Sequence, residues 1–273
     1  MTEGLITSRR NPLVGRLRQL HQTKGRRQAG LLLLEGTHLL QEVLRLRLRP
    51  RELLATELWC ERHGQLLAAL PAGLRPQLVT AEVLAAVSTT EHPDGVVLTI
   101  EPPSPQGDAS PPSWVLALDR LQDPGNLGTL LRTALAAGVE QVWLADGADP
   151  LQPKVLRASA GAALALPLLR GDGPALADRL VRAAAAGCQV VAAVVTPEAI
   201  PYWQHDWSRP TVLLLGNEGA GLAPELLALA SRQLTIPHSA AVESLNVAVA
   251  AAPLLLERWR QSFSRVSAAN AAG

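Results

Sequence analysis

Short apolar runs alternate with longer amphipathic segments through the second half of this chain. Four runs of four to six residues are apolar enough to form buried strands, and the segments between them have the spacing of amphipathic helices. The predicted strands are Val115–Leu118, Gln141–Ala145, Val190–Val195 and Val212–Leu215. Because strands that alternate with helices pair in parallel and are covered on both faces, we expect an α/β domain built on a parallel sheet.

The first hundred residues predict a smaller unit of short strands and helices. Its expected elements are the strands Leu31–Leu34, Leu53–Thr56, Gln77–Val79 and Val96–Ile100 and the helices Thr37–Leu48 and Glu61–Leu70. A Pro-rich segment without apolar periodicity follows, and such segments form extended, fairly stiff linkers. We therefore expect domains over 1–101 and 114–264, a linker over 102–113 and a disordered tail over 265–273. On this division, residues 112–273 should fold without the N-terminal domain.

The net charge of +1 conceals a basic N-terminal region. Residues 1–50 hold ten Lys or Arg against three Glu, a net charge of +7, so the rest of the chain is net −6. A basic region on a nearly neutral protein indicates a polyanionic partner such as RNA, although a solvated basic surface is the simpler alternative. The candidate RNA-binding residues are Arg9, Arg10, Arg16, Arg18, Lys24, Arg26 and Arg27.

Composition argues against several other classes of protein. Cys60 and Cys188 are far apart, and the six His are scattered without the spacing of metal ligands, so we expect neither a disulfide framework nor a metal site. No apolar run is as long as a membrane helix, and the first residues carry Arg9 and Arg10 instead of a long apolar segment. We therefore expect a cytoplasmic protein without a secretory signal or a membrane partner.

The segment Leu118–Val139 combines polar and apolar positions in a way that indicates a site. The expected elements are a turn, Gln122–Gly125, and a helix, Leu127–Ala137. Gly128 and Arg132 lie four residues apart and so share a helix face, on which an anion or a second chain could approach the guanidinium group. The alternative is that Asn126 is an ordinary N-cap and Arg132 a solvated surface charge.

Two later segments, Leu213–Leu222 and Ile236–Ala250, complete a pattern. In this order the three segments resemble the motifs of the SpoU (TrmH-like) branch of the SPOUT methyltransferases. The resemblance continues through Asp149–Gly161. It also extends to Ile6–Val14 and Leu33–Leu39, which are similar to the RNA-binding domain that precedes many members. One Gly-rich loop would be weak evidence, whereas three ordered motifs with an accessory domain are specific.

The resemblance implies S-adenosylmethionine-dependent 2′-O-ribose methylation of RNA by a homodimer, and a parallel-sheet domain with a trefoil knot. The implied catalytic residues are Arg132, Asn126, Glu218, Ser244 and Asn246. The implied cofactor-binding residues are Leu214, Gly216, Asn217, Gly219, Ile236, Ser244 and Leu245. The family's pattern makes Arg132 the acceptor of the 2′-hydroxyl proton. Because a guanidinium group stays protonated in proteins, we favour an electrostatic role at phosphate or at the developing oxyanion and leave the base role open.

Some positions depart from the family's pattern or have simpler interpretations. His238 stands where many members have Met, and Ala240 where Gly is common, which affects the expected geometry of the cofactor loop but not the class. Pro253 falls inside the last helix and should kink or divide it. Without the resemblance, Ser244 would be taken as an N-cap and Asn246 as a surface residue.

The N-terminal domain bears on the substrate, and the spacing of the motifs bears on rival functions. The accessory domain resembles small α/β, ribosomal-protein-like RNA-binding modules, and this resemblance favours large-subunit ribosomal RNA over tRNA as the substrate. A tRNA 2′-O-methyltransferase and a non-catalytic RNA-binding ribosome-assembly protein remain open alternatives. A nucleotide-binding oxidoreductase is disfavoured because the spacing of the glycines over 216–221 is not the Rossmann fingerprint. A hydrolase is disfavoured because the sequence has no Gly-x-Ser-x-Gly elbow.

Overall fold

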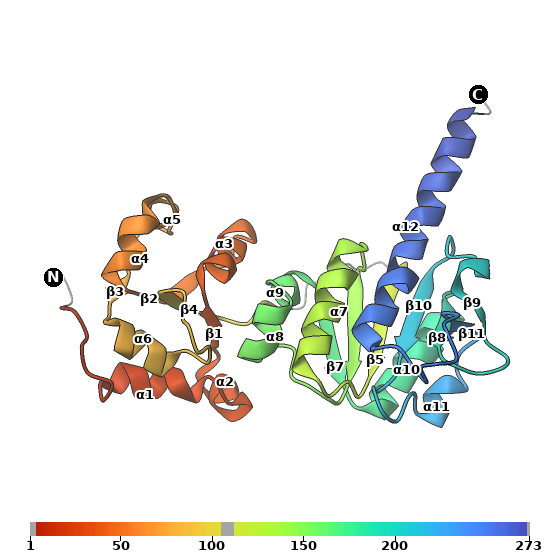
Figure 1. Ribbon diagram of the computed structural model, residues 1–273, viewed down its shortest axis with the longest axis horizontal. Helices are drawn as coiled ribbons and strands as arrows, with labels where there is room; N and C mark the ends of the chain where they lie inside the picture. The colour runs from red at the N-terminus through yellow and green to blue at the C-terminus, as the bar shows by residue number, and fades with distance from the viewer. Residues whose placement is uncertain (1–3, 105–111, 272–273) are drawn as a thin grey trace. The chain divides into compact units, whose positions relative to one another are not determined.

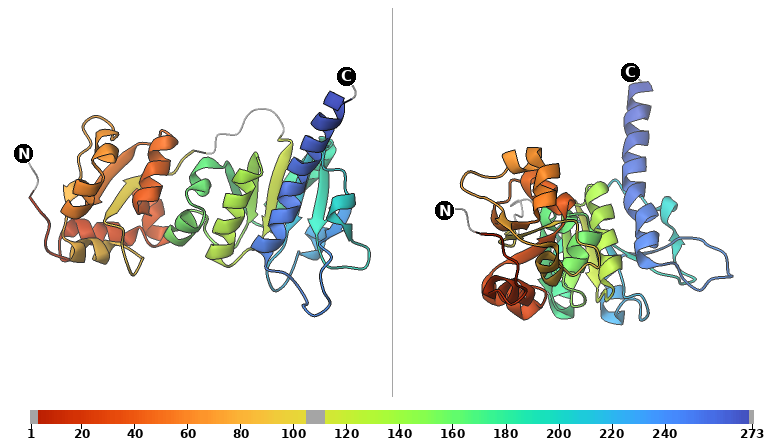
Figure 2. Two further views of the ribbon diagram at one scale, coloured as in Figure 1. Left: turned by 45° about the horizontal axis from the view of Figure 1, so that its top comes forward. Right: turned by 60° about the vertical axis from the view of Figure 1, so that its left-hand side comes forward.

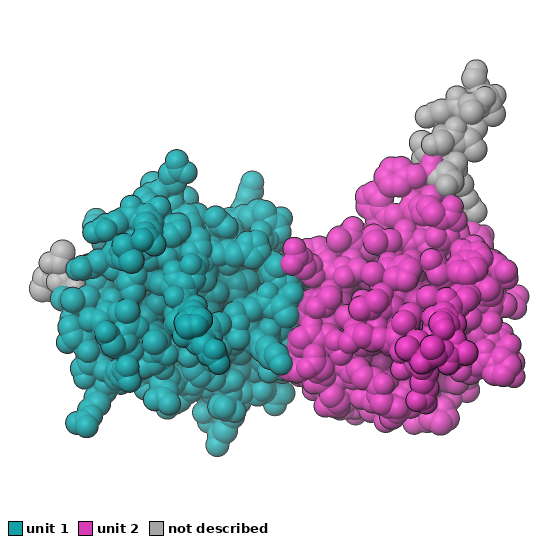
Figure 3. All heavy atoms as spheres, in the orientation of Figure 1, with its two compact units in different colours: residues 1–104, 149–165 teal, residues 105–148, 166–273 magenta. Residues whose placement is uncertain are grey.

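The structure, a computed structural model, describes residues 4–104 and 112–271, with side chains as far as Phe263. The chain forms two compact units, one of residues 1–104 with 149–165 and the other of residues 105–148 with 166–273 (Figure 3). Residues 105–111, which make up most of the expected linker over 102–113, lie outside the described residues. No helix of the described part is both long and apolar enough to cross a membrane.

The first unit contains a mixed four-stranded sheet in the order β1-β4-β2-β3. Its strands are β1 (Leu32–Glu35), β2 (Pro50–Ala55), β3 (Gln77–Leu78) and β4 (Val96–Ile100). The helices before α7 are α1 (Pro12–Gln19), α2 (Thr23–Ala29), α3 (Thr37–Arg45), α4 (Glu57–Arg62), α5 (Gly64–Ala68) and α6 (Ala81–Val87). Apolar side chains from α1, α6 and the sheet, among them Val14, Leu17, Leu33 and Leu84, form the core.

The single helix expected over Glu61–Leu70 is wrong, because two shorter helices occupy this region. Thr56 starts α4 early, since its side chain accepts a hydrogen bond from the backbone N–H of Trp59. His63 then ends α4 with a non-helical backbone, and its Nδ1 lies 2.8 Å from the carbonyl oxygen of Trp59. The break at His63 separates α4 from α5.

Residues 149–165 belong to the first unit although their sequence lies inside the expected second domain. They form α8 (Pro153–Ala158) and α9 (Ala162–Ala165), with Val155 and Leu156 buried. Two ion pairs hold the segment in its unit. Arg26 lies 2.5 Å from Asp149, and Arg157 lies 3.0 Å from Glu35. The chain thus passes between the two units three times.

The second unit is a seven-stranded, all-parallel sheet in the order β7-β6-β5-β10-β8-β11-β9 (Figure 1). Its strands are β5 (Trp114–Asp119), β6 (Gln141–Ala145), β7 (Leu168–Gly171), β8 (Gln189–Ala193), β9 (Ile200–Pro201), β10 (Thr211–Leu215) and β11 (Arg232–Thr235). The expected α/β class is confirmed. The four expected strands are those with continuous apolar runs, and β7, β9 and β11 are only partly buried.

Helices cover both faces of this sheet (Figures 1 and 2). The helix α10 (Gly173–Ala185) packs its Leu176 and Leu180 against Val115 and other apolar side chains of one face. On the other face α7 (Pro124–Ala136) packs beside α12 (Val247–Ala271). Two short helical segments, η1 (Tyr202–Gln204) and α11 (Pro224–Leu227), complete the unit.

The last helix differs from the expectation in two ways. It runs through Pro253 without ending, because Ala251, Leu254 and Leu255 on the two sides of the proline are fully buried and hold the helix in place. The expected division at Pro253 is therefore wrong. The helix also extends to Ala271, through most of the segment 265–273 for which a disordered tail was expected.

Candidate functional site

The start of α7 is set by Asp123 and not by Asn126. The Asp123 side chain accepts a hydrogen bond from the backbone N–H of Asn126 at 2.7 Å, and Pro124 occupies the first helical position. The expected turn over Gln122–Gly125 is wrong for the same reason, because the helix already begins at Pro124. Since Asp123 supplies the cap, the Asn126 side chain is available for contacts outside its own helix.

Asn126 joins the three sequence motifs in one polar cluster. Its amide nitrogen Nδ2 donates to a carboxylate oxygen of Glu218 at 3.2 Å. Its amide oxygen Oδ1 accepts a hydrogen bond from Nδ2 of Asn246 at 2.9 Å. Glu218 and Asn246 lie 92 and 120 residues after Asn126 in the sequence, yet all three meet at one end of the sheet, close to the C-terminal ends of β5 and β10. The structure brings together three of the five expected catalytic residues.

Asn246 also starts α12. Its Oδ1 accepts hydrogen bonds from the backbone N–H groups of Ala248, at 2.9 Å, and Val249, at 3.3 Å. Asn246 is therefore the N-cap, and Ser244, which was considered as a cap, lies exposed two residues earlier. One side chain thus fixes the start of α12 and its contact with α7.

Glu218 is the acceptor at the centre of the cluster. Besides Asn126, it accepts hydrogen bonds from the backbone N–H groups of Gln122 and Asp123, both at 3.3 Å. Partial burial raises the pKa of Glu218, but hydrogen bonds from its own N–H, from Asn126 and from these two backbone groups outweigh it and lower the pKa below its ordinary value. The carboxylate is therefore ionised at neutral pH and suited to ordering the cluster rather than to accepting a proton.

The loop after β10 folds back on itself around Asn217. The Asn217 side chain donates to the carbonyl oxygen of Arg120 at 2.8 Å and accepts from the N–H groups of Gly219 and Ala220. A Cβ at Gly216 would lie 2.4 Å from the backbone of Gly221. Gly216, which was expected as a cofactor-binding residue, is needed in this structure for the loop to close on itself.

Sequence reasoning missed Asp119, which anchors the same loop. Its carboxylate is 1% exposed at the end of β5, binds the Arg120 guanidinium at 2.9 Å and accepts the Ala223 N–H at 2.9 Å. An acidic residue that ends an otherwise apolar strand was the available signal, because a buried carboxylate needs charged or hydrogen-bonding partners. The turn after β5 therefore holds the loop after β10 at both of its ends.

The expected cofactor-binding residues lie near the C-terminal ends of β10 and β11. Gly216, Asn217 and Gly219 follow β10, and Ile236 follows β11, whereas Ser244 and Leu245 lie exposed before α12. The Leu214 side chain is fully buried in the core against α10, so it can present only its backbone.

The loop between β11 and α12 carries the departure from the family's pattern at His238. Its Nδ1 lies 2.7 Å from the carbonyl oxygen of Ile236, so the ring binds its own loop. Across the described residues, no group of three or more His, Cys, Asp or Glu is placed to hold a metal ion.

Arg132 stands apart from the polar cluster. Its side chain is exposed and makes no hydrogen bond or ion pair with any residue that the structure describes. Gly128 is buried, so the expected approach to the guanidinium over Gly128 is not open. Arg132 follows Asn126 by six residues, which places the two about 120° apart around the axis of α7. Within one chain, Arg132 therefore faces away from the cluster.

The structure divides the candidate RNA-binding residues into two groups. Arg26 is 5% exposed, pairs with Asp149 and donates to the carbonyl oxygens of Leu20 and His21, so assigning it to RNA is wrong. Arg16 is exposed and forms a bidentate ion pair with Glu52. The candidates that remain exposed without such an ion pair in the described chain are Arg9, Arg10, Arg18, Lys24 and Arg27.

Two family profiles match the chain. That of the SpoU rRNA methylase family matches residues 113–256, and that of the MRM3-like substrate binding domain matches residues 11–98. An uncharacterized tRNA/rRNA methyltransferase of Synechocystis is 47% identical over 265 residues, which cover 95% of this chain and 94% of the relative. The 23S rRNA (guanosine(2553)-2′-O)-methyltransferase RlmP of Bacillus subtilis is 34% identical over 251 residues, which cover 92% and 97% of the two chains.

A solved structure is similar over nearly the whole chain. The AdoMet-bound rRNA methyltransferase from Sinorhizobium meliloti matches with a TM-score of 0.78 and 32% identity, covering 94% of this chain and 98% of the other. The similarity thus includes both the parallel-sheet unit with the polar cluster and the N-terminal mixed-sheet unit.

Proposed function

The chain belongs to the SpoU rRNA methylase family, and from this premise we propose that it transfers a methyl group from S-adenosylmethionine to a ribose 2′-hydroxyl of large-subunit ribosomal RNA. The observation that carries the proposal is the cluster of Asn126, Glu218 and Asn246, which joins all three motifs at the C-terminal edge of the parallel sheet. Ligands of open α/β sheets bind outside this edge.

The residues around the cluster suit S-adenosylmethionine. Ile236 and Leu245 offer partly exposed apolar side chains, and the residues between them are mostly exposed, so this loop can contact the adenosine or methionine part of the cofactor. Gly216, Asn217 and Gly219 belong to a second loop at the same edge of the sheet, whose shape is fixed by the hydrogen bonds of Asn217. When bound, the cofactor supplies a methyl group on a sulfonium for in-line displacement by the ribose oxygen.

The contribution of the chain is positioning and electrostatics. Holding the hydroxyl in line can supply about 7–11 kcal/mol of the barrier. Glu218 binds Asn126 near the N-terminal end of α7, and Asn126 in turn binds Asn246 at the start of α12. Asn246 fixes the start of that helix. Arg132 brings a positive charge without a hydrogen-bond or ion-pair partner among the described residues, which suits an RNA phosphate or the developing negative charge on the 2′-oxygen. Ser244 lies exposed beside Leu245, where it can contact either substrate.

The choice of ribosomal RNA over tRNA rests on the N-terminal unit. The substrate-binding profile covers most of that unit, and the Bacillus 23S rRNA enzyme aligns with nearly the whole chain. The exposed residues Arg9, Arg10 and Arg18 lie at or beside α1, and Lys24 and Arg27 lie on α2. These side chains would contact RNA phosphates, so binding should weaken as salt rises.

A second copy of the chain would cover an exposed apolar stripe. Val249, Leu256, Trp259 and Phe263 are 45% to 62% exposed, and their spacing puts them within an arc of about 80° on α12. Leu135 of α7 is exposed as well. Monomeric proteins rarely leave such a stripe open to water, so we infer a homodimer formed through α7 and α12.

The test is methylation of defined RNA by the purified full-length protein. We expect methyl groups from labelled S-adenosylmethionine at a single ribose of 23S rRNA, located by resistance to alkaline cleavage, and little transfer to tRNA. Transfer to tRNA alone would replace ribosomal RNA as the substrate. RNA binding without transfer to either would favour the non-catalytic assembly protein.

A further inference from the structure

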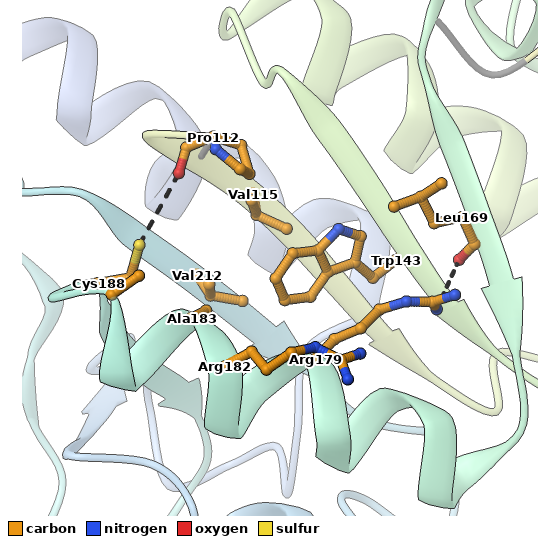
Figure 4. A pocket seen from close by; sticks show the side chains of 10 residues that line it. Pro112, Val115, Trp143, Leu169, Arg179, Arg182, Ala183, Cys188 and Val212 are labelled. Carbon is orange, nitrogen blue, oxygen red and sulfur yellow. Dashed lines mark hydrogen bonds between the residues drawn. The ribbon is translucent and has the colours of Figure 1, made fainter. Parts of the chain in front are cut away.

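A cavity of about 320 Å³ opens between α10 and the sheet of the second unit (Figure 4). Val115 and Val212 line its floor, and they pair with each other near the N-terminal ends of β5 and β10. The polar cluster follows the C-terminal ends of the same strands. Because the strands are parallel, the cavity lies toward the edge of the sheet opposite the cluster. Its volume falls at the lower end of the range for small-molecule sites.

The cavity combines an aromatic wall with two positive charges. Trp143 of β6 presents its indole on the sheet side, and Arg179 and Arg182 of α10 line the helix side (Figure 4). Leu169 and Ala183 add apolar surface. The lining is thus mostly apolar, with its charge gathered on one helix.

The two arginines are placed to bind an anion. Arg179 donates to the carbonyl oxygens of Leu169, at 3.3 Å, and Arg170, at 3.2 Å, which holds its guanidinium across the groove. A guanidinium has five N–H donors, so donors remain for a ligand. Arg182 has no hydrogen bond or ion pair within the described chain. Burial and then the charge of Arg182 lower the pKa of Arg179, and a bound anion would offset both effects.

We propose that this cavity is a second ligand site, separate from the methyl-transfer site, for a small planar aromatic carboxylate. The ring packs against Trp143, Leu169 and Ala183, since aromatic rings pack well on apolar and aromatic surfaces. The carboxylate binds Arg179 and Arg182, whose planar donors match its two oxygens. A nucleotide with several phosphates would carry more charge than two arginines in an apolar cavity can satisfy.

Cys188 provides a reporter at the far end of the cavity. Its Sγ lies 3.8 Å from the carbonyl oxygen of Pro112, and the residue lines the cavity. Burial and then Glu140 raise the pKa of the Cys188 thiol. Burial and then Glu57 and Glu61 raise the pKa of Cys60, the other cysteine of the chain, which belongs to the first unit. Cys60 is therefore a matched internal control.

The experiment measures alkylation of both cysteines in the full-length protein. N-ethylmaleimide labelling is followed by mass spectrometry with increasing 2-naphthoate or the neutral 2-naphthamide. We expect naphthoate to slow labelling at Cys188 saturably and to leave Cys60 unchanged, and the amide to need about tenfold higher concentration. Equal slowing of both cysteines, no slowing at Cys188, or equal potency of the amide would overturn the proposal.

Variants at two positions locate the effect in the cavity. Arg182→Gln removes an exposed charge and should raise the half-protecting naphthoate concentration about tenfold, whereas Arg182→Lys should raise it less. Ala183→Trp fills the cavity and should abolish protection while S-adenosylmethionine affinity stays unchanged. If the tryptophan variant does not fold, Arg182→Gln still decides, because protection at the wild-type concentration in that variant contradicts the assignment.

Discussion

Glu218 and Arg132 carry opposite charges and differ in their hydrogen-bond partners. Glu218 accepts hydrogen bonds from two backbone groups and one side chain, whereas Arg132 has no partner among the described residues of its own chain. The contacts of Glu218 are already made before any substrate binds. We propose that the charge of Arg132 serves a group that arrives with the RNA. Substitutions at the two positions should therefore have different effects.

Glu218→Gln should lower stability in a pH-dependent way. Because the folded-state pKa of Glu218 lies below its unfolded value, its contribution is present above about pH 4.3 and is lost as the pH falls through the folded pKa. The side chain is exposed, so we expect about 1 kcal/mol or less at pH 7. Urea unfolding of both proteins from pH 3 to pH 7 measures the difference. A difference that grows toward low pH would contradict the assigned direction.

Arg132→Ala should reduce methyl transfer while the fold survives. Loss of one group that stabilises transition-state charge costs about 100-fold to 1,000-fold in rate. The melting temperature and the affinity for S-adenosylmethionine should stay the same, since Arg132 has no hydrogen bond or ion pair to lose within the described chain. Single-turnover rates measure the effect, with Arg132→Lys as the charge-preserving control. An unchanged rate in Arg132→Ala would make Arg132 an ordinary surface charge.

The two glycines Gly216 and Gly219 in the loop after β10 differ in how much space surrounds them. A Cβ at Gly216 meets backbone at 2.4 Å, whereas a Cβ at Gly219 meets only the Asn217 side chain at 3.7 Å. Gly216→Ala should therefore destabilise the protein by about 1–3 kcal/mol and weaken binding of S-adenosylmethionine. Gly219→Ala is the matched control and should change stability much less. Thermal unfolding measures the stability of both variants, and calorimetry measures their affinity for S-adenosylmethionine. Equal losses of stability in the two variants would show that Gly216 is not specifically required for the loop to close.

The sequence predicted those strands whose own residues form a continuous apolar run. β6 and β10 have continuous apolar runs and appear within one residue of their expected bounds. The strand β11, in contrast, has one buried residue and is defined by its pairing with β8 and β9. The polar cluster could be expected only as a set of motifs. Its contacts depend on the order of strands in the sheet, which local sequence does not specify.

The division of the chain into units depends on long-range ion pairs. The Arg26–Asp149 and Arg157–Glu35 pairs, together with buried Val155 and Leu156, make residues 149–165 part of the first unit. Cutting the chain at the Pro-rich segment would separate Asp149 and Arg157 from their partners. The expectation that residues 112–273 fold separately therefore loses its basis. The Pro-rich composition of residues 102–113 predicted a linker there, but composition could not reveal these partners.

Asp149→Asn should strongly destabilise the first unit. Arg26 is 5% exposed, and a buried charge that loses its partner costs about 3–5 kcal/mol. Glu101→Gln is the matched control, because it removes one member of the Arg51–Glu101 pair, whose side chains are 57% and 62% exposed. That pair should contribute less than about 1 kcal/mol. Urea unfolding measures both variants, and similar small losses would mean that the Arg26–Asp149 pair does not hold residues 149–165 in place.

A homodimer would explain how Arg132 serves a site from which it faces away. On α7 it lies about 120° from Asn126, so the cluster that Arg132 completes would belong to the partner. Arg132→Ala and Asn246→Ala chains should then each be inactive alone. In a heterodimer, one site carries both defects and the other carries neither.

Mixing the two variants should therefore restore activity. Random pairing of equal amounts gives heterodimers in half of the dimers, so about a quarter of all sites should be intact. Co-refolding followed by methyl-transfer assay measures this recovery, and a mixture of two separately tagged Arg132→Ala chains controls for refolding alone. Recovery near a quarter requires Arg132 to act across the α7 and α12 interface. Background activity despite isolated heterodimers would place Arg132 and Asn246 in the site of one chain, and the shared-site arrangement would have to be abandoned.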